Sequence, residues 1–253
     1  MARRAALWSL PARGKGEAMK PLGHKSYGSI PHLPNSRMGP GDHHCSPGQA
    51  RIATERARDR HDVVIVQEKL DGSNVGIAKL NGQIIPLTRA GYHANTSPYE
   101  QHHLFAGWVT ERWALFDALL VEGERICGEW LAQAHGTRYD LNKYGQQPFA
   151  AFDIMRGMDR ALFAEVSERT NQFGLEMPHA LEIGPPMAVD AALAALNTYG
   201  YHGALDAVEG AVWRVERKGV VDFLVKYVRP DKKDGCYLES ITGEPATWNW
   251  RKR

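Results

Sequence analysis

The chain has 253 residues, of which 43% are hydrophobic and 24% charged, and its formal net charge at pH 7 is +2. This is the composition of a soluble globular protein long enough to bury a core, and the small net charge does not by itself indicate a nucleic-acid-binding protein. No apolar run approaches the ~18 residues of a membrane-spanning helix, so we expect no membrane association. The odd number and wide spacing of the cysteines argue against a disulfide framework and favour the cytoplasm, a reducing compartment; they are Cys45, Cys127 and Cys236.

The two ends of the chain differ in composition from its middle. Residues 1–48 are rich in proline, glycine, histidine and serine, which predicts irregular structure. Within them, we expect residues 1–18 to form a disordered tail or to precede a true start at Met19. A folded domain is expected over 49–230, followed by a short C-terminal tail over 231–253. The last six residues, WNWRKR, are expected to be solvated, although aromatic rings between charges also suit contact with nucleic acid.

The hydrophobic pattern of the middle region predicts strands, hairpins and helices in mixed order. The expected elements are a strand over 61–70, a hairpin over 73–89 that turns at Asn81-Gly82, a helix over 99–121, strands over 125–132 and 148–155, helices over 159–172 and 187–198, and a hairpin over 210–230 that turns near Lys218-Gly219. Asn-Gly between two alternating segments is a strong hairpin signal. The order predicts an α+β fold dominated by antiparallel sheet, with helices between the hairpins.

The tetrapeptide Lys69-Leu70-Asp71-Gly72 follows the first strand directly and suits a lysine nucleophile. An amine attacks phosphorus only when it is neutral, so we expect partial burial and a nearby metal or second cation to lower the pKa of Lys69. Asp71 is expected to accept from a ribose or to hold a metal-bound water, and Gly72 to let the backbone approach a ligand. Alone, the tetrapeptide is equally consistent with a strand that ends in a solvated surface turn.

Six segments of the sequence occur in a fixed order that carries more information than any one of them. They are residues 69–74, TRAG at 88–91, CGEW at 127–130, FAAFDI at 149–154, EGAVW at 209–213 and LVKYV at 224–228. In this order they resemble the motifs of the covalent nucleotidyltransferases, the superfamily of ATP-dependent DNA and RNA ligases and mRNA capping enzymes. The resemblance spans residues 67–229 and is closest to the ATP-dependent RNA ligases of the phage nick-sealing type.

The resemblance implies a fold, cofactors and a substrate. The fold is the nucleotidyltransferase (adenylation-domain) fold of antiparallel sheets flanked by helices. The cofactors are ATP and Mg²⁺, with Mn²⁺ as a second choice of metal. The partner is RNA, or a nicked duplex, with a 5′-phosphate and a 3′-hydroxyl. The irregular N-terminal segment is expected to pack over the nucleotide pocket.

The resemblance also implies roles for individual residues. Lys69 would become lysyl-AMP, and Lys226 would grip the α-phosphate and neutralise the charge that grows on it. Phe152 would stack on the purine, with Phe149 as the alternative. The nucleotide-binding residues implied are Glu68, Asp71, Gly72, Asn74, Arg89, Glu129, Phe152 and Glu209, and the metal-binding residues are Glu209 and Glu129. Within this set, Glu68 would contact adenine through its backbone and Arg89 the ribose and the terminal hydroxyl of the substrate.

The sequence departs from the family pattern in two places. The last strand carries one lysine, Lys226, where the family has Lys-x-Lys, and Arg229 or Lys232 is the candidate substitute. The 24 residues after Arg229 are too few for the OB-fold of roughly 80–100 residues that follows in DNA ligases and capping enzymes, so no OB-fold domain is expected. Asp153 is expected to be a structural hydrogen-bond acceptor.

Other functions stay open from the sequence. One alternative keeps the lysyl-AMP but passes AMP to a protein or small molecule. Another is a non-catalytic module that binds nucleotide or nucleic acid. The histidine pairs in GDHHCSPG at 41–48 and EQHHL at 100–104 match no standard metal-ligand spacing.

Overall fold

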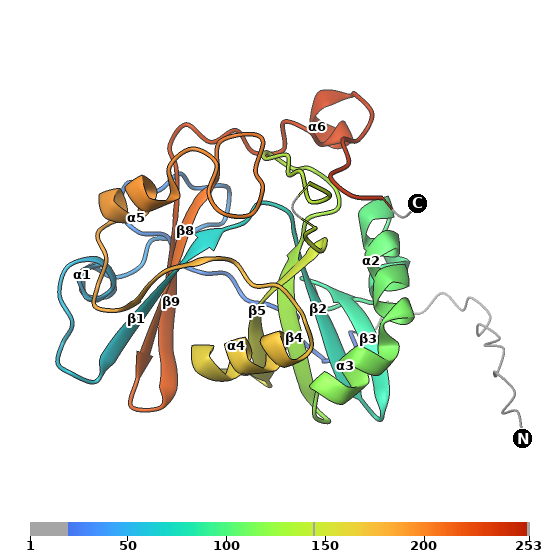
Figure 1. The fold of residues 1–253 in the computed structure, drawn as a ribbon, viewed down its shortest axis with the longest axis horizontal. Coiled ribbons are helices and arrows are strands. Elements are labelled where there is room, and N and C mark those ends of the chain that lie inside the picture. Colours follow the sequence, from blue (N-terminus) through green and yellow to red (C-terminus); the bar gives the residue numbers. More distant parts are fainter. Residues whose placement is uncertain (1–19, 144, 252–253) are drawn as a thin grey trace, which may run out of the picture.

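Two antiparallel sheets form the framework of the computed structural model, which describes residues 20–143 and 145–251 (Figure 1). The predicted tail over 1–18 lies outside these residues. The first sheet has the strand order β7-β1-β8-β9 and the second the order β3-β2-β4-β5-β6. The strands are β1 (Asp62–Lys69), β2 (Ser73–Leu80), β3 (Gln83–Thr88), β4 (Glu124–Trp130), β5 (Phe149–Arg156), β6 (Asp159–Arg160), β7 (Ala180–Gly184), β8 (Gly210–Arg217) and β9 (Val220–Val228). The helices are α1 (Pro47–Thr54), the short 3₁₀ helix η1 (Ala94–Thr96), α2 (Glu100–Glu111), α3 (Trp113–Leu119), α4 (Phe163–Gln172), α5 (Val189–Leu196) and α6 (Glu239–Thr242). The α+β class and the antiparallel sheets are as predicted.

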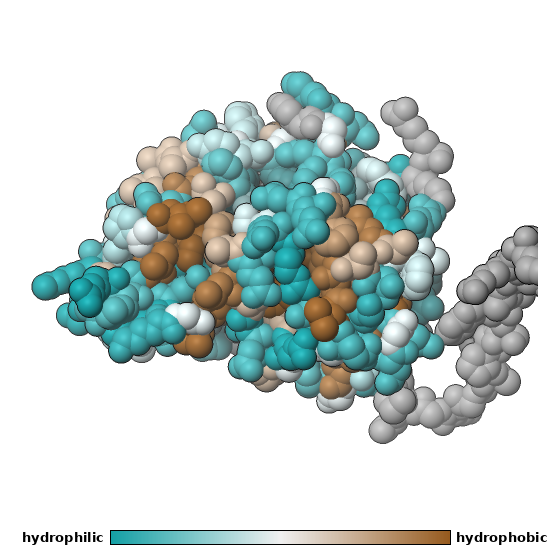
Figure 2. All heavy atoms as spheres, turned by 60° about the horizontal axis from the view of Figure 1, so that its bottom comes forward, coloured by the Kyte–Doolittle hydropathy of each residue, from teal (hydrophilic) through white to brown (hydrophobic). Residues whose placement is uncertain are grey.

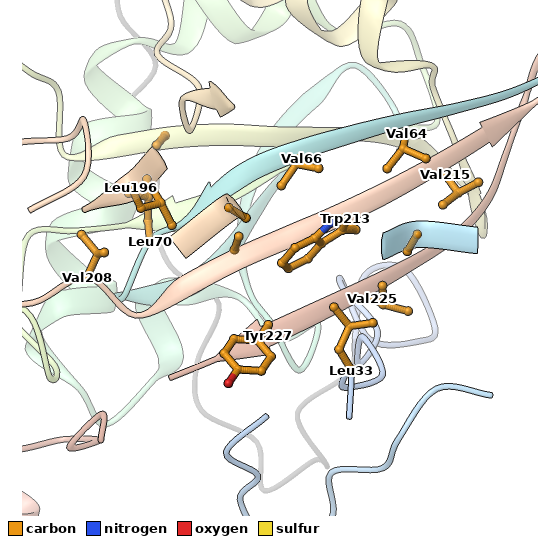
Figure 3. Close-up of a cluster of buried hydrophobic side chains, with 14 of the residues drawn as sticks. Leu33, Val64, Val66, Leu70, Leu196, Val208, Trp213, Val215, Val225 and Tyr227 are labelled. Atoms are coloured by element: carbon orange, nitrogen blue, oxygen red, sulfur yellow. The ribbon is translucent and has the colours of Figure 1, made fainter. Parts of the chain in front are cut away.

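The first sheet buries one face against α1 and α5. Trp213 of β8 lies at the centre of this core, among valines of β1 and β9 (Figure 3). Its indole N–H donates to the Met187 carbonyl at 2.8 Å, so the one polar atom of the ring is satisfied. Strand β1 is hydrogen-bonded to β7 on one side as far as Gln67 and to β8 on the other side as far as Lys69, so its backbone is held at the residue where it ends. A nucleophile at the end of such a strand has a well-defined position.

The second sheet packs against α2 and α3, and its core is largely aromatic. The ring centroids of neighbouring aromatic side chains lie 5.7 to 6.5 Å apart, and the rings are those of Trp108, Phe116, Trp130 and Phe149. These tilted and edge-on arrangements are the ones that aromatic pairs prefer. The short link between β1 and β2 joins the two cores directly.

Both predicted hairpin turns are confirmed. Asn81 and Gly82 have φ of 52° and 69°, and Lys218 and Gly219 have φ of 50° and 80°. Positive φ at both central residues gives turns that match the twist of the flanking strands. The hairpins are therefore β2–β3 and β8–β9.

The prediction of one continuous helix over 99–121 is wrong. The chain leaves helical geometry at Arg112, with φ −111° and ψ 20°, and forms α2 and α3 instead. The Arg112 guanidinium donates to the Trp108 carbonyl and lies over the Trp108 ring, 4.4 Å from its centroid. The break keeps Phe116 on the core but turns Trp113 outward, where it is 51% exposed.

Three further differences concern short elements. The helix predicted over 159–172 begins at Phe163, because residues 159–160 turn back as β6 to pair with β5. Strand β7 and helix α6 were not predicted. Helix α1 was also missed, although Ser46 and Gln49 form a capping box at its start with proline at the first turn.

The chain ends wrap around this framework. Backbone hydrogen bonds of 2.8 to 3.0 Å join residues 31–37 to Lys226 and Val228, so this segment covers the edge of β9. At the other end, the Asn249 side chain donates to the Leu131 carbonyl at 2.8 Å and accepts from Tyr139 N–H at 3.0 Å. The expectation of a solvated terminus is therefore wrong for 248–250, whereas Arg251 is exposed as expected, and residues 252–253 lie outside the described part of the chain.

The exposed surface is mixed. Figure 2 shows a face on which hydrophilic residues predominate and hydrophobic residues form separate areas. In the described residues, no helix is long and apolar enough to cross a membrane.

Candidate active site

All ten residues predicted for the site line one cavity, which has a volume of about 610 Å³. They come from both sheets and are Glu68, Lys69, Asp71, Gly72, Asn74, Arg89, Glu129, Phe152, Glu209 and Lys226. The N-terminal segment also contributes, through Tyr27, Gly28 and Ile30, so its predicted packing over the pocket is confirmed for these residues.

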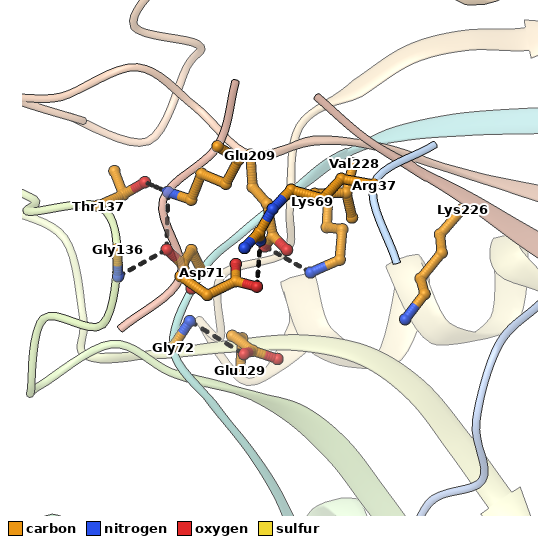
Figure 4. Close-up of polar contacts among 12 residues, drawn as sticks. Arg37, Lys69, Asp71, Gly72, Glu129, Gly136, Thr137, Glu209, Lys226 and Val228 are labelled. Carbon is orange, nitrogen blue, oxygen red and sulfur yellow. Dashed lines mark hydrogen bonds and ion pairs between the residues drawn. The ribbon is translucent and has the colours of Figure 1, made fainter. Parts of the chain in front are cut away.

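Lys69 and Glu209 form an ion pair at the centre of the site (Figure 4). Lys69 ends β1 opposite Gly210, the first residue of β8, which brings the adjacent Glu209 to the lysine. The Lys69 Nζ lies 2.5 Å from Glu209 Oε2. Burial by itself lowers the pKa of Lys69, but the carboxylates of Glu209 and Glu129 outweigh it and raise the pKa above that of an ordinary lysine.

The prediction of a lowered Lys69 pKa is therefore wrong as far as the protein's own groups are concerned, and the effect of a metal stays a prediction. The reason is that the fold brings more negative than positive charge to Lys69. Lys226, the second cation expected, has a lowered pKa of its own, because of burial first and the charge of Lys69 next.

Glu129 lies on the β2 side of the lysine. It is opposite Asn74 in the β2–β4 register, and its Oε1 accepts from Gly72 N–H at 3.1 Å. Burial raises the pKa of Glu129 to about 8. The Oδ1 atom of Asn74 is buried and has no hydrogen-bond partner among the described residues, which suits an acceptor for a bound hydroxyl or amine.

Gly72 is required by a contact within the protein. A Cβ at this position would lie 2.5 Å from the carbonyl oxygen of Trp130. The close approach at Gly72 is thus to strand β4, whereas the sequence had indicated an approach to a ligand.

Asp71 faces away from the lysine nucleophile. Its Oδ2 accepts from Gly136 N–H at 2.9 Å and lies 2.8 Å from Lys232 Nζ. Its backbone N–H donates to the Tyr139 hydroxyl at 2.9 Å. The carboxylate is therefore already engaged by protein groups.

The two candidate stacking rings have different environments. Phe152 is half-buried, lines the cavity and packs edge-on against Tyr27, with ring centroids 5.1 Å apart. Phe149 is fully buried in the aromatic core of the second sheet, where its ring centroid lies 5.7 Å from that of Trp108. Of these two rings, only Phe152 lines the cavity.

Lys226 and Arg89 are held by the N-terminal segment. The Lys226 Nζ lies 3.6 Å from Asp42 Oδ1, and the other Asp42 oxygen is 3.0 Å from His32 Nε2. The Arg89 guanidinium donates to the Gly28 carbonyl at 3.4 Å and to Ser29 Oγ at 3.3 Å. No local pattern in the sequence marks Asp42 or His32, because their contacts depend on how residues 31–37 pair with β9.

Asp153 closes one end of the cavity as a structural acceptor, as predicted. It accepts from the Tyr27 hydroxyl at 2.6 Å, from Arg214 Nη1 at 2.5 Å and from Arg160 Nε at 3.2 Å. The partners were not predicted, and Tyr27 in particular comes from a segment with no motif.

The comparisons with known proteins agree with this geometry. The profile described as RNA ligase matches residues 62–228, which holds every predicted site residue. The chain belongs to the RNA ligase family. The phage nick-sealing subtype remains a prediction, and no curated protein matches the chain.

Solved structures similar to this RNA ligase family member support the fold. They include a Naegleria gruberi RNA ligase with PPi (17% identity, 94% of this chain and 65% of that chain, TM-score 0.56) and a putative ATP-dependent DNA ligase from Aquifex aeolicus (16%, 80% and 49%, TM-score 0.52). An archaeal ATP-dependent RNA ligase is similar over 80% of this chain and 48% of its own, with 22% identity and a TM-score of 0.47. The chain thus spans about half to two thirds of the length of these proteins. The predicted nucleotidyltransferase fold is confirmed.

The carboxylates of the site suit a metal ion that is bound partly by the nucleotide. Within residues 20–143 and 145–251, no three His, Cys, Asp or Glu side chains form a cluster that could hold a metal, and this includes the histidine pairs. Mg²⁺ is commonly bound by one or two carboxylates together with substrate phosphates and waters. Glu129 and Glu209 fit such a site, in which the nucleotide supplies the remaining ligands.

Proposed function

We propose that this protein is an ATP-dependent RNA ligase that works through a lysyl-AMP intermediate. The observation that carries the proposal is the Lys69–Glu209 pair, held at 2.5 Å inside a cavity that is lined from both sheets. Family membership over 62–228 supports the same reaction type. The ribonucleic acid substrate would carry a 5′-phosphate and a 3′-hydroxyl, and a nick in a duplex is the form we propose.

The first step makes a phosphorus–nitrogen bond. Lys69 Nζ attacks the α-phosphorus of ATP in line with the α–β bridging oxygen, and pyrophosphate leaves with the bond electrons. Lys69 must first give up a proton, and Glu209 Oε2 is the acceptor nearest to it. Because Lys69 ends a strand that is paired with β8 at this residue and with β7 as far as Gln67, the backbone of the nucleophile is held in place for this attack.

Two further steps transfer and release the AMP. An oxygen of the RNA 5′-phosphate attacks the phosphorus of lysyl-AMP, which frees the Lys69 amine and forms a 5′–5′ pyrophosphate linkage. The 3′-hydroxyl then attacks the RNA phosphorus, loses its proton and displaces AMP. Each step is a displacement at phosphorus, in which positioning and charge neutralisation lower the barrier.

Other cavity residues are proposed to bind the nucleotide. Phe152 would stack on the adenine, and Lys226 and Arg89 would contact the phosphate and ribose. A Mg²⁺ or Mn²⁺ ion would be held by Glu209 and Glu129 and would neutralise charge on the phosphates. A Naegleria gruberi RNA ligase variant similar in fold (16% identity, 71% of this chain and 53% of that chain, TM-score 0.51) was solved with AMP and Mn.

The test is self-labelling with ATP that carries a label in its α-phosphate. We expect acid-stable label on the wild-type protein and none on Lys69→Ala, and a weaker signal with GTP or NAD. Supplying nicked RNA duplex with a 5′-phosphate should then move the label to RNA and seal the nick. Label that never leaves the protein for any polynucleotide would indicate another acceptor, and absence of label would indicate a binding module.

A further inference from the structure

A buried lysine from the segment after β9, Lys232, contacts the site residue Asp71 without itself lining the cavity. The Lys232 side chain is only 3% exposed, and its Nζ lies 2.8 Å from Asp71 Oδ2 and donates to Thr137 Oγ1. Figure 4 shows Asp71 with Gly136 and Thr137 on the side opposite Lys69. A buried ammonium is tolerated only where its charge and its protons are matched by partners. Lys232 is thus built into the protein interior.

Asp71 connects three parts of the chain at this point. Its carboxylate holds Lys232 and the Gly136 N–H, while its own N–H is fixed by Tyr139. Asp71 is two residues from Lys69, on the turn that leads from β1 to β2. A movement of the Asp71 carboxylate would therefore shift the turn that directly follows Lys69, and with it the end of strand β1.

The segment that carries Lys232 follows β9 and is hydrogen-bonded at its start, Arg229, to Glu209. The Arg229 N–H donates to the Glu209 carbonyl at 2.9 Å, and the Lys232 N–H donates to the Arg229 carbonyl at 3.1 Å. Lys232 thus ties the backbone that positions Glu209 to the turn that positions Lys69. It also neutralises Asp71, whose charge otherwise acts on the nearby carboxyl groups of Glu129 and Glu209.

Neither candidate for the missing second lysine lines the cavity. Arg229 is paired with Asp231 at 2.7 Å, and Lys232 is engaged by Asp71 and Thr137. The residues of the cavity lining include Lys226 but neither of these two cations.

We propose that Lys232 is a positioning residue: it fixes the Asp71 carboxylate, and through it the turn that directly follows Lys69, without binding the phosphates of the nucleotide. The inference rests on the proposed function of Lys69. It assigns to Lys232 an effect on the rate of lysyl-AMP formation and not on the affinity for ATP.

The experiment compares Lys232→Met, Asp71→Asn, the double variant and Lys233→Met in the full chain. Lys233 is the neighbouring exposed lysine and serves as the matched control. The maximal rate of labelling and the half-saturating ATP concentration are measured together with thermal unfolding. We expect Lys232→Met to lower the maximal rate at least tenfold and to leave the half-saturating concentration within twofold of wild type. Lys233→Met should match wild type in both.

The double variant separates positioning from other roles. Removing both charges leaves no buried ion without a partner, so Lys232→Met/Asp71→Asn should recover most of the rate lost in Lys232→Met. If Lys232→Met alone does not fold, the double variant should still label faster and unfold at a higher temperature than Asp71→Asn.

Two results would overturn the inference while the proposed function stands. The first is a half-saturating ATP concentration raised tenfold in Lys232→Met with no recovery in the double variant, which would make Lys232 a phosphate ligand. The second is a Lys232→Met variant that labels like wild type. Absence of label on the wild-type protein would instead overturn the proposed function, and the positioning role with it.

Discussion

The Tyr27 hydroxyl donates a 2.6 Å hydrogen bond to Asp153, a carboxylate that is completely buried on β5. This bond fastens the N-terminal segment to the end of the cavity. Hydrogen bonds to charged groups contribute about 1.5–3 kcal/mol. We expect Tyr27→Phe to lower the free energy of unfolding by about this amount, as measured by urea denaturation.

The control for this change is Tyr199→Phe, because Tyr199 is largely exposed. It should leave the unfolding midpoint unchanged. Equal midpoints for Tyr27→Phe and wild type would show that the two arginines alone satisfy Asp153.

Glu209→Gln should slow self-adenylylation strongly. The substitution keeps an oxygen near Lys69 but removes the charge that accepts the proton and that would hold the metal. Loss of one electrostatic group at a reacting centre typically costs ~10²–10³ in rate, and we expect a loss of this size in labelling at saturating ATP. Glu239→Gln, an exposed change in α6, should label like wild type; a Glu209→Gln rate near that of Glu239→Gln would contradict the role.

Phe152 and Phe149 should respond differently to truncation. Stacking of a base on an aromatic ring is worth ~1–3 kcal/mol, so Phe152→Ala should raise the half-saturating ATP concentration by ~5- to 150-fold. Phe152→Tyr keeps the ring and should restore binding. Phe149→Ala should instead cost about 3–5 kcal/mol of stability, because it opens a cavity in the aromatic core; the reverse pattern would make Phe149 the stacking ring.

Glu68 should make stability depend on pH. Burial raises the pKa of Glu68 from its ordinary 4.5 to about 7, and the Tyr201 N–H only partly offsets this. A folded-state pKa above the unfolded value means that the folded protein holds the proton more tightly. The contribution of Glu68 is therefore complete below pH 4.5 and is lost as pH rises through about 7.

The Glu68→Gln variant has no titratable group at this position. Relative to this variant, the wild type should lose up to about 3 kcal/mol of stability between pH 4.5 and 8. Chemical denaturation of both proteins across this range checks it. If the difference in the free energy of unfolding between the two proteins stays constant across this pH range, Glu68 does not titrate in it.

The sequence predicted the parts of the fold that depend on local signals. The Asn81-Gly82 turn is set by residues next to one another, and so is the alternation that marks the flanking strands. The capping box at Ser46 is equally local, but the proline- and glycine-rich composition around it led to a prediction of irregular structure. The break at Arg112 could not be predicted, since it depends on how the two halves of the helix meet the sheet.

The ordered motifs predicted which residues line the site but not the charges around them. The Lys69 pKa depends on Glu209 and Glu129, which lie far along the chain, and their combined effect reverses the prediction. Lys232 and Asp42 belong to no motif and reach the site only through tertiary contacts. The order of motifs along the sequence identifies the residues of the site, but it does not give the distances between their charged groups.

The Lys69–Glu209 pair joins residues 140 positions apart in the chain. During synthesis on the ribosome, Lys69 emerges long before its counter-charge, and β1 has no β8 to pair with. We therefore expect a nascent chain to stay unreactive towards ATP until β8 and β9 have been made. Translation intermediates stalled before Glu209 would then acquire no AMP, so activation would be coupled to the near-completion of the domain.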